Sequence, residues 1–165
     1  MQIVIVSDHS EQVASLRALA LDAGLEQVEG FTHPAAALDW CIDHTPDLIL
    51  ADYMMRACDG LEFLRRARAL AHLAEVPIVL MLPPLPGLGS LRAAAWKLGA
   101  TDFLSSPVDH TEFVARVRNL LLLRCATQPR VDSDRLAQAE SAAGLDSRWL
   151  ETPALAAAQS LAQFH

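Results

Sequence analysis

Hydrophobic residues along the first 124 positions follow two different periods. Short continuous apolar runs, rich in Val, Ile and Leu, are typical of strands that are buried on both faces. Between them, apolar residues recur every three or four positions, which is typical of amphipathic helices. The runs predict strands at 3–6, 27–31, 48–51, 78–82 and 103–104. The intervening stripes predict helices at about 10–20, from 34 to 42, at 60–68, at about 90–98 and from about 110 to 123.

Residues at the ends of these segments support the helix assignments. Ser10 is a candidate N-cap, and Gly24 is a candidate stop signal for the first helix. Pro34 suits the first position of the second helix. Asp109 or Thr111 begins the last helix.

Five repeats of strand then helix predict an α/β fold. The alternation implies a doubly wound, five-stranded parallel sheet with helices on both faces. In such sheets, ligands bind beyond the carboxyl ends of the strands. The residues at those positions are Ser7, Asp8 and His9, then Asp52, Leu82, Pro83, Ser105 and Ser106.

The pattern changes near Ala126. We expect a domain over residues 1–124, followed by a linker and a helical C-terminal extension over 125–165. Within the extension, helical pieces are predicted at 133–143 and from Thr152 onward. Two roles are open for it: a dimerising or docking element, or the start of a linker to an output domain on a longer native chain.

Composition excludes several classes of protein. The 165 residues are 52% hydrophobic and 20% charged, with a net charge of −7. Twelve Arg are scattered along the chain, so a nucleic-acid surface, which needs clustered positive charge, is not expected. No apolar run is long enough to span a membrane, and no signal peptide is expected. Three Cys without metal-ligand spacing suit a reducing cytoplasm.

Two carboxylates carry the candidate chemistry. Asp8 and Asp52 end predicted neighbouring strands, so their side chains should lie close together. Two close carboxylates repel one another unless a cation lies between them, and Mg²⁺ prefers such oxygen ligands. A metal-assisted phosphoryl acceptor and a simple pair of solvated strand-end carboxylates are both consistent with this spacing. No Gly lies in 7–10, which argues against a nucleotide or flavin cofactor.

Two longer segments carry a family resemblance. They are PDLILADYMMRACDGLE at 46–62 and LGATDFLSSP at 98–107. Both resemble segments of the receiver domain of two-component response regulators, and the resemblance covers about residues 1–124. It implies a flavodoxin-like sheet with strand order 2-1-3-4-5.

The resemblance also implies roles for individual residues. Asp52 would accept a phosphoryl group from a histidine kinase or a phosphotransfer protein. Mg²⁺ would be bound by Asp8, Asp52 and the backbone carbonyl of Met54. Phe103 would be the aromatic residue whose rotamer reports activation, and the Ser106–Pro107 bond would be cis. The domain would signal through its fourth helix, fifth strand and fifth helix, and a second copy of the chain in a homodimer is one partner to be expected. Its only enzymatic activity would be Mg²⁺-dependent self-phosphorylation and dephosphorylation.

The chain departs from the family at four positions. Ser7 replaces a second acidic residue, and Arg56 replaces a proline. At the switch positions, Leu82 replaces Thr or Ser, and Ser106 replaces a phosphate-binding Lys. The one lysine of the chain is Lys97, in the predicted fourth helix, so it does not stand at that position.

These departures leave two functions open. The first is a phosphoacceptor receiver, favoured by Asp8 and Asp52. The second is a degenerate receiver that acts as a phosphorylation-independent interaction or dimerisation module, favoured by Leu82 and Ser106. A small α/β enzyme is disfavoured because the chain has no base or nucleophile set beyond the two aspartates.

Overall fold

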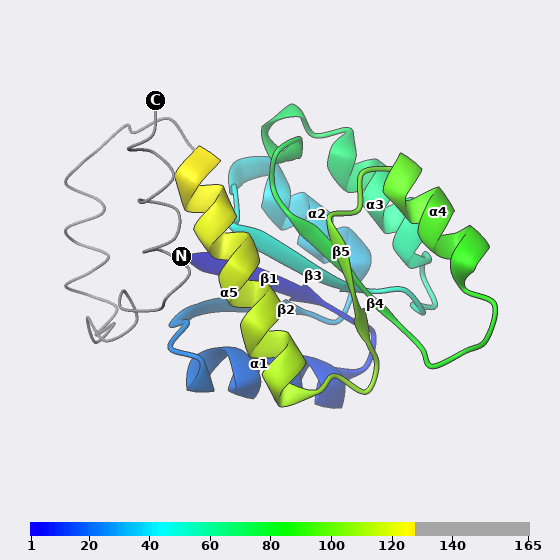
Figure 1. Cartoon of the computed structure of the whole chain (residues 1–165). Helices are drawn as coiled ribbons and strands as arrows, with labels where there is room; N and C mark the ends of the chain where they lie inside the picture. The colour runs from blue at the N-terminus through cyan, green and yellow to red at the C-terminus, as the bar shows by residue number, and fades with distance from the viewer. Residues whose placement is uncertain (128–165) are drawn as a thin grey trace, which may run out of the picture. The chain divides into compact units, whose positions relative to one another are not determined.

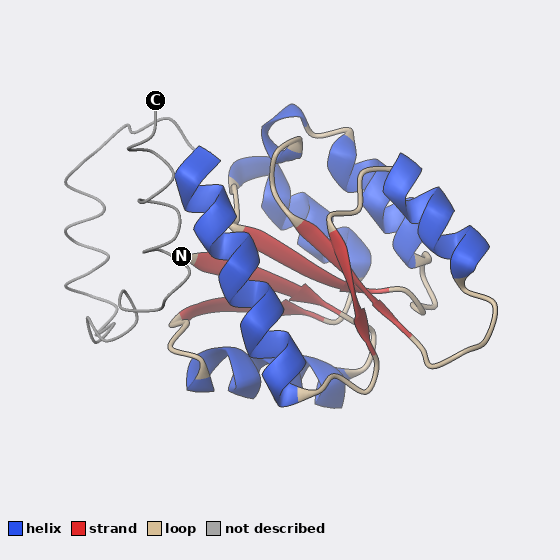
Figure 2. Cartoon of the chain, viewed as in Figure 1, coloured by secondary structure: helices blue, strands red, loops and turns tan. Residues whose placement is uncertain are grey.

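The computed structural model describes residues 1–127 as a five-stranded parallel sheet between two layers of helices (Figures 1 and 2). The strand order is β2-β1-β3-β4-β5, which confirms the predicted doubly wound topology. The strands are β1 (Gln2–Val6), β2 (Gln27–Phe31), β3 (Leu48–Asp52), β4 (Ile78–Leu82) and β5 (Asp102–Ser105). The helices are α1 (Ser10–Asp22), α2 (Pro34–Asp43), α3 (Gly60–Arg68), the short 3₁₀ helix η1 (Ala71–Leu73), α4 (Gly89–Lys97) and α5 (His110–Thr127).

The alternation of side chains along each strand divides the core into two layers. One set of strand residues, including Ile5 and Leu50, packs against α1 and α5. The other set, including Val6 and Ala51, packs against α2, α3 and α4. Because successive strand residues point to opposite faces, a continuous apolar run supplies both layers. Figure 1 shows α1 and α5 on one side of the sheet and α2, α3 and α4 on the other.

The predicted helix ends are confirmed in part. Pro34 is the first residue of α2, and Gly24 adopts a φ of 83° just after α1. The side chain of Asp109 accepts a hydrogen bond from the backbone N–H of Glu112 at the start of α5. Ser10 is not the cap of α1: it is already helical, and the N-cap position is His9, which makes no side-chain cap. The loop before α1 is instead tied by the Ser7 hydroxyl, which accepts a hydrogen bond from the His9 N–H at 3.2 Å.

The strand register gathers the carboxyl ends of the central strands. Val6 pairs with Ala51, Asp52 with Met81, and Leu82 with Ser105. The side chains that follow these positions therefore meet at one edge of the sheet. That edge is the location predicted for the functional site.

The last helix extends beyond residue 124. α5 ends at Thr127, so 125–127 continue its last turn. The predicted linker and helical pieces of the extension lie outside the described residues. No helix within residues 1–127 is long and apolar enough to cross a membrane.

Candidate functional site

Asp52 ends β3 and is almost completely buried, with 6% of its surface exposed. Its Oδ1 accepts a hydrogen bond from the backbone N–H of Met54 at 3.2 Å. Burial raises the pKa of this carboxyl; the hydrogen bonds from Met54 and Ser7 counteract the shift, and the nearby charge of Asp8 adds to it. The raised pKa means that the surrounding groups do not fully compensate the loss of water around the Asp52 charge. A bound cation would stabilise that charge.

Ser7 connects β1 to this carboxylate. Its side chain is fully buried, and its hydroxyl lies 3.1 Å from Oδ2 of Asp52, to which it donates. Its oxygen also lies 3.1 Å from Oε1 of Gln12. A second acidic residue at this position would add a negative charge, whereas serine adds a neutral donor. Ser7 therefore helps to orient Asp52 without increasing the local negative charge.

Asp8 follows directly and is bound by Arg56. The Arg56 backbone N–H donates to Oδ2 of Asp8 at 2.9 Å, and Nε of the same residue donates to the same oxygen at 3.1 Å. The backbone hydrogen bond from Arg56 is the main reason that the pKa of Asp8 is lowered, although desolvation opposes it. Asp8 thus remains ionised beside Asp52.

The other oxygen of Asp8 has no hydrogen-bond partner. Oδ1 is buried, and although Nδ1 of His9 lies 3.0 Å away, the arrangement is not that of a hydrogen bond. An unpartnered carboxylate oxygen beside a second carboxylate fits Mg²⁺, which binds one or two carboxylates and keeps several waters. Within residues 1–127 no group of three or more His, Cys, Asp or Glu side chains is placed to hold a metal ion.

The two expected switch positions, Leu82 and Ser106, carry no charge. Leu82 is buried in the apolar layer that also contains Phe103 and Ala95. Ser106 is partly buried, and its peptide bond to Pro107 is cis, as predicted. Lys97 is the exposed last residue of α4. Neither Leu82 nor Ser106 therefore provides a cation at this edge of the sheet.

Phe103 is packed inward, with 7% of its surface exposed. The ring of Trp96 meets it edge-on, with centroids 4.8 Å apart and planes at 83°. The guanidinium of Arg92 lies over the Phe103 ring, 5.5 Å from its centroid. Trp96 is 51% exposed. A side chain from α4 thus covers the aromatic residue of β5 and remains open to solvent.

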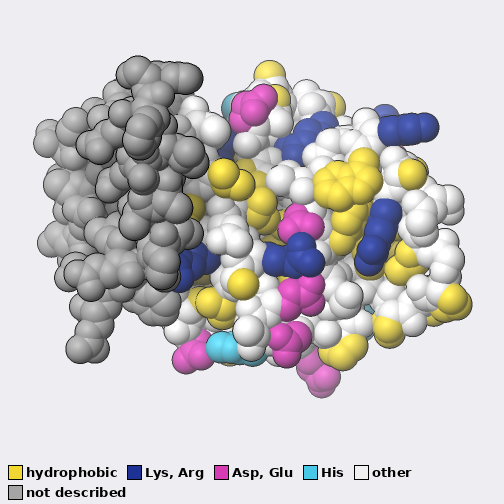
Figure 3. Space-filling model, in the orientation of Figure 1, with side chains coloured by type: hydrophobic (Ala, Val, Ile, Leu, Met, Phe, Trp, Pro, Cys, Tyr) yellow, Lys and Arg dark blue, Asp and Glu magenta, His cyan; other side chains and the backbone are white. Residues whose placement is uncertain are grey.

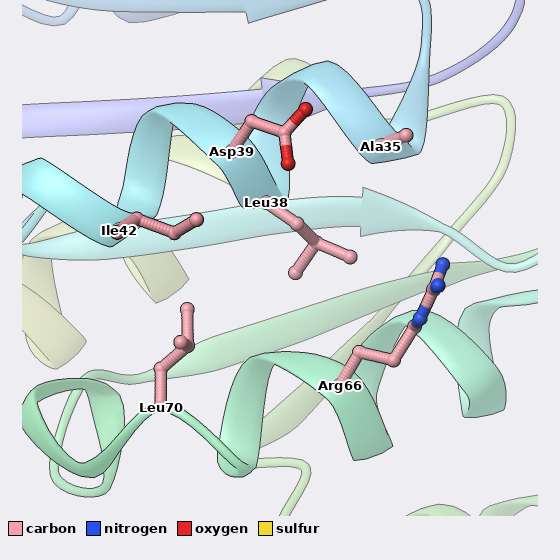
Figure 4. Close-up of a pocket in the computed structure, with 6 residues that line it drawn as sticks. All are labelled: Ala35, Leu38, Asp39, Ile42, Arg66 and Leu70. Atoms are coloured by element: carbon pink, nitrogen blue, oxygen red, sulfur yellow. The ribbon is translucent and has the colours of Figure 1, made fainter.

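Two hollows lie on the surface of the described part of the chain. One opens beside the strand ends and is lined by Asp8, Ser10, Thr32, His33, Pro34, Arg56 and Ala57. The other lies between α2 and α3, where Leu38 and Leu70 point toward one another (Figure 4). The second hollow is mainly apolar and has Asp39 and Arg66 beside it, without a nucleophile or metal-ligand set. The chemistry therefore belongs to the first.

The face formed by α5, β5 and α4 mixes all side-chain types (Figure 3). Acidic, basic and apolar side chains alternate over it, and no extended basic patch appears there. Arg116 on this face is neutralised by Asp102 at 2.6 Å and by Glu112 at 2.9 Å. The face suits contact with a protein better than contact with a nucleic acid.

Comparison with known proteins agrees with this geometry. The family model described as "Response regulator receiver domain" matches residues 3–118. The chain is 41% identical over 125 residues to the cyclic di-GMP phosphodiesterase response regulator RpfG of Xanthomonas campestris, covering 75% of this chain and 32% of that protein. It is 34% identical over 119 residues to the response regulator PleD of Caulobacter vibrioides, covering 72% of this chain and 26% of that protein. The chain therefore matches less than a third of the length of these relatives.

A solved structure shows the same fold. A putative response regulator from Chloroflexus aurantiacus superposes with a TM-score of 0.63 at 26% identity, covering 73% of this chain and 98% of that one.

Sequence reasoning missed two contacts of the site. It treated Ser7 as the loss of an acid and did not predict its hydrogen bond to Asp52. It noted Arg56 as a replaced proline and did not predict its two bonds to Asp8. The contact between Arg56 and Asp8 did leave a signal in the sequence. Arginine in place of the expected proline supplies a backbone N–H donor that proline lacks.

Proposed function

The chain belongs to the response regulator receiver family, and on that basis we propose that it accepts a phosphoryl group on Asp52 in a two-component phosphorelay. The observation that supports this most is the position of Asp52, buried at the end of β3 with oriented donors and with the ionised Asp8 nearby.

The reaction would transfer the phosphoryl group from a phosphohistidine of a kinase or phosphotransfer partner. One carboxylate oxygen of Asp52 attacks phosphorus, a P–O bond forms and the P–N bond breaks. The leaving imidazole takes up a proton. Asp8, Asp52 and the backbone carbonyl of Met54 would hold Mg²⁺, which neutralises charge on the transferring group. The described residues contribute orientation: Ser7 and the Met54 N–H fix Asp52, and Arg56 fixes Asp8.

The output would pass through α4, β5 and α5. Phe103 is in contact with Trp96 and Arg92 of α4, so a change in its rotamer would change the surface of α4. The chain spans only part of its relatives, and an output domain on a longer native chain is part of the proposal, as is a homodimer.

A second function is favoured by Leu82 and Ser106. These residues lack the hydroxyl and the cation that would join a phosphoryl group to the switch. A degenerate receiver would present the α4-β5-α5 face to a partner independently of phosphate. The two functions predict different responses to a phosphoryl mimic.

Binding of beryllofluoride tests the proposal. With Mg²⁺ present, ¹⁹F NMR of the wild type should show a protein-bound signal, and Asp52→Asn should abolish it. A wild type that shows no bound signal at saturating Mg²⁺ would support the degenerate receiver.

A further inference from the structure

Arg56 is one of the four positions at which the chain departs from the expected pattern. It stands where the resemblance predicts proline, so it contributes a backbone N–H and a guanidinium that proline lacks. Both donors converge on a single oxygen, Oδ2 of Asp8, at 2.9 and 3.1 Å. Among the described residues, Arg56 is the only hydrogen-bond donor to Asp8.

The two partners of this pair differ in their exposure. The Asp8 side chain is 11% exposed, whereas the Arg56 side chain is 87% exposed. Arg56 therefore reaches in from solvent, and its guanidinium loses little hydration when it binds Asp8. Its planar fork binds the carboxylate through Nε, and no contact of its terminal nitrogens is seen in the described structure.

Arg56 binds the same carboxylate, that of Asp8, that a divalent cation would need as a ligand. Mg²⁺ binds ionised oxygen and dehydrates reluctantly, so a carboxylate already paired with two donors is a weaker ligand. Oδ2 is held by Arg56, whereas Oδ1 has no hydrogen-bond partner and lies 3.0 Å from Nδ1 of His9. Metal binding and the Arg56 pair thus compete for the charge of one side chain.

We propose that Arg56 is a resident counter-ion of Asp8 that competes with Mg²⁺ and sets the concentration of metal at which the site fills. The inference deepens the proposed function, on which it rests for the identity of the metal. It assigns Arg56 the part of a positioning residue, because Arg56 acts on the metal site through Asp8.

The test is a Mg²⁺ titration of the full chain, followed by ¹H–¹⁵N NMR in the absence of any phosphodonor. Arg56→Ala removes the guanidinium and keeps the backbone donor, so its affinity for Mg²⁺ should rise about twofold to fivefold. Arg56→Pro removes both donors and should increase the affinity by about tenfold. Asp8→Asn should abolish the binding, which places the metal at this carboxylate.

Arg65→Ala is the matched control. Arg65 is also an exposed arginine, but it pairs with Glu62 on α3, away from Asp8. Its loss changes the net charge by the same amount as Arg56→Ala and should leave the affinity unchanged. An Arg56→Ala protein that binds Mg²⁺ no more tightly than the wild type overturns the inference. An equal gain in Arg65→Ala also overturns it, because the effect would then be one of net charge.

A measurement on the wild type keeps the test independent of variant folding. The Nε–H resonance of Arg56 should move toward its solvent-exposed position as Mg²⁺ saturates the site, while that of Arg65 stays in place. An unchanged Arg56 resonance at saturation overturns the inference. Because no phosphoryl group is involved, these results stand whether or not Asp52 is later found to be phosphorylated.

Discussion

The backbone N–H of Ser106 donates a hydrogen bond of 2.7 Å to the carbonyl oxygen of Leu82. This bond joins the ends of β4 and β5 at the two positions from which a receiver normally contacts its phosphoryl group. The two expected switch positions are therefore joined through their backbone, whereas their side chains differ from those that the family uses.

Restoring the cation should strengthen binding of a phosphoryl mimic. Ser106→Lys places an ammonium group beside the site, and we expect its affinity for beryllofluoride with Mg²⁺ to rise about tenfold, the value of a charge-assisted hydrogen bond. Titration by ¹⁹F NMR measures it. Ser105→Lys adds the same charge one residue earlier, at an exposed position on the opposite side of β5, and should have little effect. Equal gains in both variants would contradict the specific role of position 106.

Burial of Asp52 should make its charge costly to the folded state. Its folded pKa is raised by desolvation, so the folded protein binds the proton more tightly than the unfolded chain does. In EDTA at pH 7, Asp52→Asn should raise the free energy of unfolding by on the order of 1 kcal/mol. The gain should shrink as the pH falls through the raised pKa, because wild-type Asp52 then protonates.

Urea unfolding of both proteins at pH 7 and near pH 4 measures this difference. Adding Mg²⁺ at pH 7 should stabilise the wild type and reduce the advantage of the variant. If the Asp52→Asn protein is less stable than the wild type at pH 7 without metal, the prediction is wrong.

Arg68 should be a major contributor to stability on the α3 side. It donates to the carbonyl oxygen of Gly99 through Nε at 3.0 Å and through Nη2 at 2.8 Å, and Nη1 donates to that of Leu73. Arg68→Ala leaves both carbonyls without these donors and should cost about 2–3 kcal/mol in urea unfolding. Arg65→Ala, an exposed neighbour, should cost less than about 1 kcal/mol.

Gly99 gives a second test of the same contact. It adopts a φ of 91°, and a Cβ there would lie 3.0 Å from Nε of Arg68. Gly99→Ala should therefore strain the backbone and displace Arg68. We expect the free energy of unfolding to fall by about 1–3 kcal/mol. A Gly99→Ala protein as stable as the wild type would show that this turn is not constrained as described.

Trp96 should report the state of Phe103. Replacing Trp40 and Trp149 by Phe leaves Trp96 as the only tryptophan. Because its ring packs edge-on against Phe103, beryllofluoride with Mg²⁺ should change its emission if the switch moves. Phe103→Ala in the same background should abolish that change. Emission that is unaffected by bound beryllofluoride would favour the degenerate receiver.

The sequence was sufficient to predict the layers of the fold. Continuous runs such as 48–51 predict doubly buried strands, and the strand-helix alternation predicts parallel pairing, so the meeting of Asp8 and Asp52 at one edge follows. The contacts of Arg56 and Ser7 could not be predicted this way. They depend on the path of two loops, and loop geometry is set by the surrounding tertiary structure rather than by a period.

The same distinction applies to the helix ends. Asp109 was predictable because an aspartate before a helical stripe is a strong cap. Ser10 has the same local signal, but the fold places His9 at the cap position and uses the Ser7 hydroxyl to fix the loop. At this helix end the tertiary structure therefore overrides the local preference for Ser10 as the cap.

The most direct test of the central claim is the intact mass of the chain after incubation with Mg²⁺ and a small phosphodonor. The account predicts that the wild type gains the mass of one phosphoryl group, that Asp52→Asn gains none, and that EDTA prevents the gain. A wild type that never gains this mass, or an Asp52→Asn protein that gains it equally, would contradict phosphorylation at Asp52.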